Sequence, residues 1–332
     1  MPTNIHGAKL FISRDIPDTG INLLVKAGFD ISIWKEDIPI TQRELINNAK
    51  QSEALLCTSA DRIDKHFLNE CGHLKIISQY SAGFDNMDVE EATRLGIPLG
   101  NTPDVLSNAT ADVAFGLMLA VSRKMFYMHK TILGGGWNYF RPKANLGKEL
   151  TNKTLGIFGL GRIGYKTAAR CRGAYGMDII YCNRNPNLEV EEKLGARKVG
   201  FDELLSSSDV LSVHCTLSDE TRGIFDKTAF AKMKRSAIFI NTSRGPVHNE
   251  EDLADALTRG VIWGAGLDVT NPEPMDPANP LLSMENVCIL PHIGSATEEA
   301  RNEMSRLAAE NIIKFYINGR VPHIINPEVL NQ

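Results

Sequence analysis

Three residues whose side chains could do chemistry lie in the last third of the chain: Arg244, Glu273 and His292. Each follows a short apolar run with the composition of a strand, and α/β enzymes hold their ligands just beyond the carboxyl ends of such strands. Taken singly, a loop arginine is usually a surface group, a histidine a structural one, and a glutamate between two prolines a solvated turn. The three together, each after a strand end, indicate a catalytic site.

A glycine-rich loop precedes these segments and indicates what binds beside them. The apolar run Leu155–Phe158 leads into the sequence GLGRIG at residues 159–164 and then into a helical pattern over Tyr165–Ala174. In such a loop the first glycine permits a tight turn, the second lets the backbone approach a pyrophosphate, and the third allows close helix–strand packing. The helix start adds free N–H groups and a positive dipole end. The residues expected to contact a dinucleotide here are Leu160, Gly161, Arg162 and Ile163.

The residues after the next expected strand, Asp178–Cys182, bear on which dinucleotide binds. Sites that prefer NAD carry an acidic residue about 20 positions after the glycine loop, where it binds the ribose 2′-hydroxyl. Here that place holds Asn183, followed by Arg184 and Asn185. A missing carboxylate and a nearby guanidinium favour a 2′-phosphate. We therefore predict cofactor contacts from these three residues and a preference for NADPH, with NADH also possible. The alternative is that Arg184 is a solvated loop cation.

Short apolar runs alternate with helical patterns along the chain, which is typical of parallel α/β architecture. A long helix is expected over Ser107–Leu133, ended by three consecutive glycines, and a final helix over Thr297–Ile317. Thr41 is expected to cap a helix that runs to Ala49, because Glu44 completes a capping box. The strands expected in the first third of the chain are Lys9–Ile12, Phe29–Ile33, Ala54–Cys57 and Leu74–Ser78.

The composition is that of a globular enzyme with room for two domains. The 332 residues carry a net charge of −4, with 43% hydrophobic and 23% charged residues, so nothing indicates a nucleic-acid surface. The longest apolar stretch, Ala109–Val121, is too short to span a membrane and contains Asp112. The N-terminal residues lack the order of a secretory signal, and the six cysteines are scattered without a CxxC pair. We therefore expect a cytoplasmic protein that binds no metal, nucleic acid or membrane.

Several motifs together resemble those of the D-2-isomer-specific 2-hydroxyacid dehydrogenase family, over nearly the whole chain. Within the family, the sequence is most similar to glyoxylate/hydroxypyruvate reductases. The motifs are SAGFDN at 81–86, NTPDV at 101–105, the GLGRIG loop, NTSRG at 241–245, AGLDVTNPEP at 265–274 and LPHIGSAT at 290–297. The resemblance implies two doubly wound parallel-sheet α/β domains. A Rossmann-type dinucleotide-binding domain at 106–298 would be inserted into a flavodoxin-like substrate domain formed by 1–105 and 299–332.

The resemblance implies that the protein reduces glyoxylate or hydroxypyruvate to glycolate or D-glycerate by hydride transfer from NADPH. Arg244, Glu273 and His292 would catalyse this reduction. His292, as imidazolium, would donate a proton to the carbonyl oxygen as negative charge develops there. Glu273 would orient the ring and favour its charged form. Arg244 would pair with the substrate carboxylate and polarise the carbonyl. The further substrate contacts implied are the backbone N–H groups of Ala82 and Gly83, and Ser295.

More cofactor contacts and an assembly also follow from the resemblance. The additional cofactor contacts are Thr110, Thr216, Thr242, Asp268 and Gly294. Residues Trp137–Leu150 match a region that lies at a homodimer interface in the family, from which an aromatic side chain can reach the partner's site. Trp137 matches that pattern and Phe140 departs from it. We therefore expect a homodimer, and the contact between subunits at the site stays open.

Other functions stay open at this point. A D-3-phosphoglycerate or another D-2-hydroxyacid dehydrogenase is one alternative, because Ser59-Ala60 resembles phosphoglycerate dehydrogenases, although Thr58 replaces the basic residue that those enzymes use for phosphate. A different class, co-repressors that sense NAD(H), shares the fold, although Arg184 argues against it. Glu273 argues against a formate dehydrogenase. The sequence does not decide between glyoxylate and hydroxypyruvate, though the polar loop Thr58–Asp61 favours the latter, which carries a hydroxyl.

Overall fold

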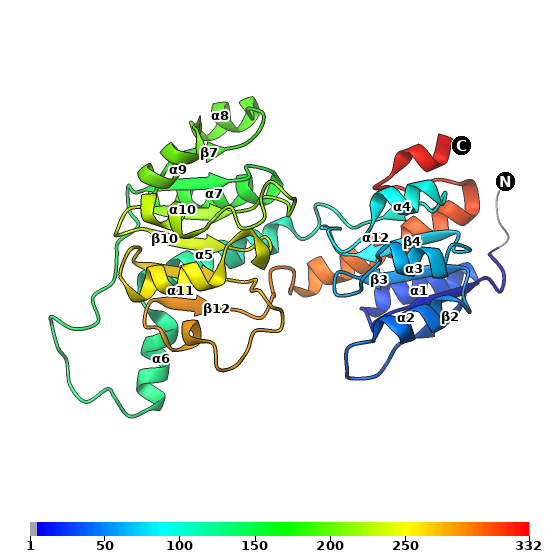
Figure 1. The fold of residues 1–332 in the computed structure, drawn as a ribbon, viewed down its shortest axis with the longest axis horizontal. Helices are drawn as coiled ribbons and strands as arrows, with labels where there is room; N and C mark the ends of the chain where they lie inside the picture. Colours follow the sequence, from blue (N-terminus) through cyan, green and yellow to red (C-terminus); the bar gives the residue numbers. More distant parts are fainter. Residues whose placement is uncertain (1–4, 332) are drawn as a thin grey trace. The chain divides into compact units, whose positions relative to one another are not determined.

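The computed structural model describes residues 5–331. The chain divides into two compact units, which we call unit 1 (Met1–Leu106 with Ala296–Gln332) and unit 2 (Ser107–Ser295). Each unit is built on one parallel sheet with helices on its faces (Figure 1). The fold class expected from the sequence is confirmed, since both sheets are parallel and doubly wound.

Unit 1 holds a five-stranded parallel sheet in the order β2-β1-β3-β4-β5. This is the flavodoxin-like order, which reverses between β1 and β3. Three expected strands are found nearly as predicted. The fourth begins two residues later, because Leu74 lies in the turn after α3 (Lys65–Glu70) and donates its N–H to the Cys71 carbonyl. The strands are β1 Lys9–Ile12, β2 Asp30–Ile33, β3 Ala54–Thr58, β4 Ile76–Tyr80 and β5 Leu99–Gly100.

Among the described residues, five α-helices cover this sheet, and the last of them comes from the far end of the chain. In α12, Ser305 accepts the Gly20 N–H at 3.0 Å, and the Ala308 carbonyl accepts the Ser78 hydroxyl at 2.9 Å. A Cβ at Gly20 would lie 2.2 Å from the Ser305 carbonyl oxygen, so this packing requires glycine. The capping box predicted at Thr41 is present. The helices are α1 Asp18–Ala27, α2 Gln42–Ala49, α3 Lys65–Glu70, α4 Val89–Arg94 and α12 Glu298–Asn318.

Unit 2 holds a seven-stranded parallel sheet in the order β12-β11-β10-β9-β6-β7-β8. The order reverses between β6 and β9, which is the Rossmann arrangement with one further strand. Leu155 and Ile157 face one apolar cluster while Phe158 faces the other, as expected for a sheet buried on both faces. The strands are β6 Thr154–Phe158, β7 Asp178–Cys182, β8 Arg197–Lys198, β9 Val210–Val213, β10 Ile238–Asn241, β11 Gly264–Leu267 and β12 Val287–Ile289.

Two helix predictions in unit 2 need correction. The expected helix over Ser107–Leu133 is two helices, α5 (Ser107–Ser122) and α6 (Met125–Leu133), because Lys124 adopts a left-handed conformation with φ 54°. The helix after the glycine loop begins three residues earlier than expected, since Gly161 is its N-cap and accepts the first helical hydrogen bond. The other helices are α7 Arg162–Tyr175, α8 Leu188–Leu194, α9 Phe201–Ser207, α10 Lys227–Lys232 and α11 Glu250–Thr258.

Candidate active site

The glycine loop has the geometry that a dinucleotide needs. Gly159 follows β6 with φ +94°, and a Cβ there would lie 2.6 Å from the backbone nitrogen of Cys215. A Cβ at Gly164 would lie 2.7 Å from the Gly159 carbonyl oxygen, so both positions exclude larger residues. At Gly161, in contrast, a Cβ would meet no atom of the described chain within 4 Å. The backbone is therefore open at the N-terminus of α7, where N–H groups can bind a pyrophosphate. The residues present fit a bound dinucleotide.

The loop after β7 is tied to the glycine loop by side-chain amides. Asn183 accepts the Leu160 N–H at 2.6 Å and donates to the Leu160 carbonyl at 3.3 Å. Asn187 donates to the same carbonyl at 3.2 Å. The side chain of Asn183, which the sequence suggested as a cofactor ligand, thus supports the position of Leu160. Spacing alone marks the residue but does not reveal this second role.

Arg184 lies on the surface beside a carboxylate that the sequence did not point to. Its guanidinium contacts Glu220 at 2.6 Å, and the two side chains are 78% and 73% exposed. Lys198 donates to the Arg184 carbonyl at 3.0 Å. Asn185, the third predicted contact of this loop, is exposed. Glu220 could not be found by spacing, because it lies 36 residues from Arg184 in a different loop.

His292 and Glu273 form a hydrogen-bonded pair, 2.9 Å between His292 Nδ1 and Glu273 Oε2. His292 has φ 52°, a left-handed conformation that costs a non-glycine residue about 1 kcal/mol or more. The next two N–H groups, of Ile293 and Gly294, donate to the two carboxylate oxygens of Asp268 at 2.8 and 2.7 Å. Asp268 is buried after β11, so it anchors the strained loop that carries the histidine.

The Glu273 carboxylate is held in its ionised form. Burial alone would raise its pKa, but the hydrogen bond and charge of His292, the Thr270 N–H at 3.0 Å and the charge of Arg244 together lower it below its usual value. An ionised carboxylate accepts the Nδ1–H of His292 and leaves Nε2 available to exchange a proton. Both peptide bonds that precede the flanking prolines, Pro272 and Pro274, are cis.

The loop after β10 brings Arg244 to the same region. The buried Asn241 amide donates to the Arg244 carbonyl at 2.9 Å and lies 3.0 Å from His248 Nδ1. A Cβ at Gly245 would lie 1.9 Å from the Thr270 carbonyl oxygen, so only glycine lets this loop pack on the segment that holds Glu273. Arg244, Glu273 and His292 are therefore grouped at the carboxyl edge of one sheet, as the strand pattern predicts.

The other expected contacts of unit 2 lie around the same edge. Thr110 donates to the Gly294 carbonyl at 3.1 Å, and a Cβ at Gly294 would lie 2.9 Å from Asp268. Thr242 lies 3.3 Å from His214 Nδ1, and the Thr216 carbonyl accepts the Thr221 hydroxyl. Ile163, Arg162 and Ser295 are at least partly exposed.

In unit 1, the loop with Ala82 and Gly83 is held through its carbonyl groups. The Ser81 carbonyl accepts the Thr102 N–H at 2.9 Å. The Ala82 carbonyl accepts the Asn101 amide at 2.7 Å, and the Gly83 carbonyl accepts the Gln79 amide. Because a trans peptide points its N–H away from its C=O, these bonds fix the directions of the Ala82 and Gly83 N–H groups.

The polar loop after β3 is satisfied mainly by its own neighbours. Asp61 is buried, and one of its oxygens accepts the Ser13 hydroxyl, the Thr58 N–H and the Thr58 hydroxyl at 2.5, 2.6 and 3.0 Å. Asn86 donates to the Asp61 carbonyl at 2.7 Å and to Gln79 at 2.8 Å. The polarity of Thr58–Asp61 is thus used within unit 1, which weakens the sequence argument that it favours hydroxypyruvate.

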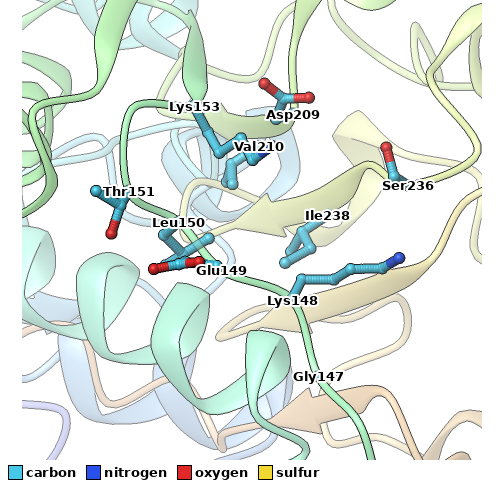
Figure 2. A pocket seen from close by; sticks show the side chains of 10 residues that line it. All are labelled: Gly147, Lys148, Glu149, Leu150, Thr151, Lys153, Asp209, Val210, Ser236 and Ile238. Carbon is cyan, nitrogen blue, oxygen red and sulfur yellow. The ribbon is translucent and has the colours of Figure 1, made fainter.

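A separate hollow lies at the opposite, amino edge of the unit 2 sheet (Figure 2). It is a cavity of about 320 Å³ beside the first residues of β6, β9 and β10. Its Asp209 accepts the Thr154 N–H and the Lys234 ammonium, both at 2.9 Å. None of the predicted site residues lines it. Within residues 5–331 we find no group of His, Cys, Asp or Glu side chains arranged for a metal, and no helix there is long and apolar enough to cross a membrane.

Comparison with known sequences identifies the family. Residues 115–294 match the family described as D-isomer specific 2-hydroxyacid dehydrogenase, NAD binding domain. The chain is 43% identical to a glyoxylate reductase of Thermococcus litoralis over 98% of each chain. It is 41% identical to the human glyoxylate reductase/hydroxypyruvate reductase, covering 92% of this chain and 94% of the human one.

Solved structures agree. A glyoxylate reductase from Paecilomyes thermophila superposes with a TM-score of 0.85 at 33% identity, covering 96% of this chain and 98% of that one. An NADPH-dependent glyoxylate/hydroxypyruvate reductase from Sinorhizobium meliloti, in complex with NADP and malonate, gives 0.83 at 27% identity, with 97% of each chain covered. The chain therefore belongs to the D-isomer-specific 2-hydroxyacid dehydrogenases and is an NAD(P)-dependent enzyme of that family.

Proposed function

We propose that the protein reduces glyoxylate and hydroxypyruvate to glycolate and D-glycerate, with NADPH as its preferred cofactor. The observation that carries this proposal is the 2.9 Å bond between His292 Nδ1 and Glu273 Oε2, beside Arg244 at the edge of a dinucleotide-binding sheet. Its sequence relatives include glyoxylate reductases and glyoxylate reductase/hydroxypyruvate reductases. A bound nicotinamide supplies the hydride.

His292 acts as the general acid in this proposal. Glu273 is ionised and accepts from Nδ1, so the proton that leaves is the one on Nε2. As the keto carbon is reduced, its oxygen gains negative charge and takes that proton. The carboxylate of Glu273 stabilises the imidazolium before the step and keeps the ring in one orientation throughout it. The Asp268 bonds to Ile293 and Gly294 keep the loop in its strained conformation.

Arg244 binds the substrate carboxylate through its planar guanidinium. The N–H groups of Ala82 and Gly83 are proposed to bind the same carboxylate, and Ser295 to add a contact. Support comes from the hydrogen bonds to the Ser81 and Ala82 carbonyls, which share their peptide units with the Ala82 and Gly83 N–H groups and fix the directions of these groups. Small residues there leave the backbone accessible. In this division of roles, unit 1 is the substrate domain.

Unit 2 is proposed to hold the cofactor. Its pyrophosphate would lie on the backbone of the glycine loop at Gly161, where a Cβ would meet no described atom within 4 Å. Arg184 is proposed to favour a 2′-phosphate, since position 183 holds an amide and not a carboxylate. The remaining proposed contacts are Leu160, Arg162, Ile163, Asn183, Asn185, Thr110, Thr216, Thr242, Asp268 and Gly294.

A homodimer is also proposed, through α6 and the segment that follows it. None of the nine residues of α6 is buried, although most of them are apolar. Leu133, Trp137, Tyr139 and Phe140 are all exposed. In Figure 1 this segment extends away from the sheet of unit 2. An apolar segment of this size is expected to be covered by another protein surface, here a second copy of the chain.

All six cysteines are free thiols, which suits the proposed cytoplasmic location.

The test is cofactor absorbance with glyoxylate, hydroxypyruvate and 3-phosphohydroxypyruvate, each with NADPH and with NADH. We expect turnover of the first two and a lower KM for NADPH. Arg184→Ala should raise the KM for NADPH about tenfold and that for NADH less than twofold, as for loss of a hydrogen bond to a charged group. Turnover of none of the keto acids would refute the activity and favour a binding role. Equal effects of Arg184→Ala on both cofactors would refute the NADPH preference alone.

A further inference from the structure

Arg184 is paired with a carboxylate of the chain itself. Its guanidinium lies 2.6 Å from Glu220, which is in the loop after β9, whereas Arg184 follows β7. These two strands lie on either side of β6, which carries the glycine loop. The ion pair therefore spans the end of the sheet at which the adenosine part of a dinucleotide lies in a Rossmann site.

The charges around this pair are unequal. Lys198 donates to the Arg184 carbonyl, which places a second cation beside the same loop. Glu220 opposes them with one carboxylate. A phosphate monoester is close to dianionic at neutral pH and binds a guanidinium through the same donors that a carboxylate uses. A 2′-phosphate must therefore displace Glu220 from Arg184 or remain near its negative charge.

NADH can bind without displacing Glu220 from Arg184. It has a hydroxyl at the ribose 2′ position, so its binding neither needs the guanidinium nor suffers repulsion from the carboxylate. Both side chains are exposed by more than 70%, so the pair itself is weak and can open. The carboxylate thus penalises one cofactor and not the other.

We propose that Glu220 is a specificity-determining residue that competes with the 2′-phosphate of NADPH for Arg184. This rests on the proposed role of Arg184 in NADPH preference and extends it to a pair of residues. The ratio of affinities for the two cofactors is then set by the Arg184–Glu220 contact and not by the arginine alone.

The test is Glu220→Gln, which keeps the size of the side chain and removes its charge. Calorimetric titration without substrate gives the Kd of NADPH, NADH, 2′,5′-ADP and 5′-AMP. We expect NADPH and 2′,5′-ADP to bind about threefold to tenfold more tightly, and NADH and 5′-AMP to change less than twofold. The gain should shrink at high salt, because the charges are exposed.

A matched control is Glu203→Gln, which removes an exposed carboxylate paired with Arg197 at 2.7 Å in the same unit. It should leave the affinity ratio unchanged. In the Arg184→Ala variant, adding Glu220→Gln should change the ratio of the NADPH and NADH affinities less than twofold. The cation for which the carboxylate and the phosphate compete is then absent.

Two results would overturn the proposal. One is a ratio in Glu220→Gln within twofold of the wild type. The other is an equal gain with and without Arg184, which would mean that Glu220 acts through general charge. Failure of the NADPH preference itself is seen separately, as an Arg184→Ala variant that weakens both cofactors alike.

Discussion

Both units reverse their strand order once, but the residues at the two reversals differ in kind. In unit 2, the glycine loop follows β6 at the reversal between β6 and β9, and a Cβ on Gly161 would meet no described atom within 4 Å. In unit 1, the reversal between β1 and β3 is occupied by side chains, with Asp61 holding the Ser13 and Thr58 hydroxyls. Glycine leaves the backbone open at the reversal in unit 2, whereas a buried polar network occupies the reversal in unit 1.

The difference shows what each crevice contributes. An open backbone at the N-terminus of a helix can bind a phosphate directly. Side chains that occupy such a place can only support the residues beside them, and in unit 1 the network continues from the Asp61 main-chain carbonyl through Asn86 and Gln79 to the Gly83 carbonyl. The same architecture therefore serves recognition in one unit and support of a loop in the other.

The largest expected effects on cofactor binding and stability come from the glycine loop. Gly161→Val should raise the Kd of NADPH more than tenfold, because its side chain would occupy the open space, while stability changes by about 1 kcal/mol or less. Gly159→Ala should instead lower stability by about 2–4 kcal/mol, since φ is +94° and the new Cβ would lie 2.6 Å from the Cys215 nitrogen. Calorimetric binding and urea unfolding measure the two. Weak binding without instability in Gly159→Ala would contradict these roles.

The network of unit 1 should respond in the opposite way. Asp61→Ala leaves two hydroxyls and one N–H without their acceptor, which should lower stability by about 2–4 kcal/mol. Asp61→Asn keeps a neutral oxygen acceptor and should lose about half as much. Because the network holds the Gly83 carbonyl, both variants should raise the KM of the keto acid and leave the Kd of NADPH within twofold. A change confined to NADPH binding would mean that the crevice of unit 1 is not a support for this loop.

A smaller, pH-dependent effect is expected from unit 2, which also has buried polar side chains beneath its Arg244 loop. Burial lowers the pKa of His248 to about 4, so the folded protein keeps this ring neutral while the unfolded chain protonates it near pH 6.5. The contribution of the neutral His248 ring to the free energy of unfolding is therefore fully present above pH 6.5. It is lost as the pH drops towards 4, by about 2 kcal/mol at pH 4.5. His248→Gln should reduce this loss in urea unfolding, whereas the exposed His66→Gln should not. An unchanged acid dependence in His248→Gln would contradict the assignment.

Much of the fold is local in origin and could be predicted. The strand Lys9–Ile12, the capping box at Thr41 and the glycine loop after β6 follow from periodicity and turn chemistry, and the structure confirms them. The break at Lys124 could not be predicted, because the apolar pattern continues through it and only the backbone of one residue changes hand.

The candidate site divides in the same way. The grouping of Arg244, Glu273 and His292 follows from strand ends that share one edge of a parallel sheet. The supporting contacts do not follow, since Asp268 was expected only as a cofactor contact and Glu220 not at all, and the folded chain alone joins them to the His292 loop and to Arg184. Their acidic side chains have no distinctive spacing, and an isolated carboxylate is usually solvated.

The most direct measurement is a single turnover by a preformed complex of enzyme and NADPH, mixed rapidly with hydroxypyruvate, in the wild type and in His292→Gln. The variant should bind NADPH within twofold of the wild type but oxidise it about a hundredfold to ten-thousandfold more slowly. Oxidation of NADPH by His292→Gln at the wild-type rate would contradict the assignment of the general acid, and with it the chemistry proposed for this sheet edge.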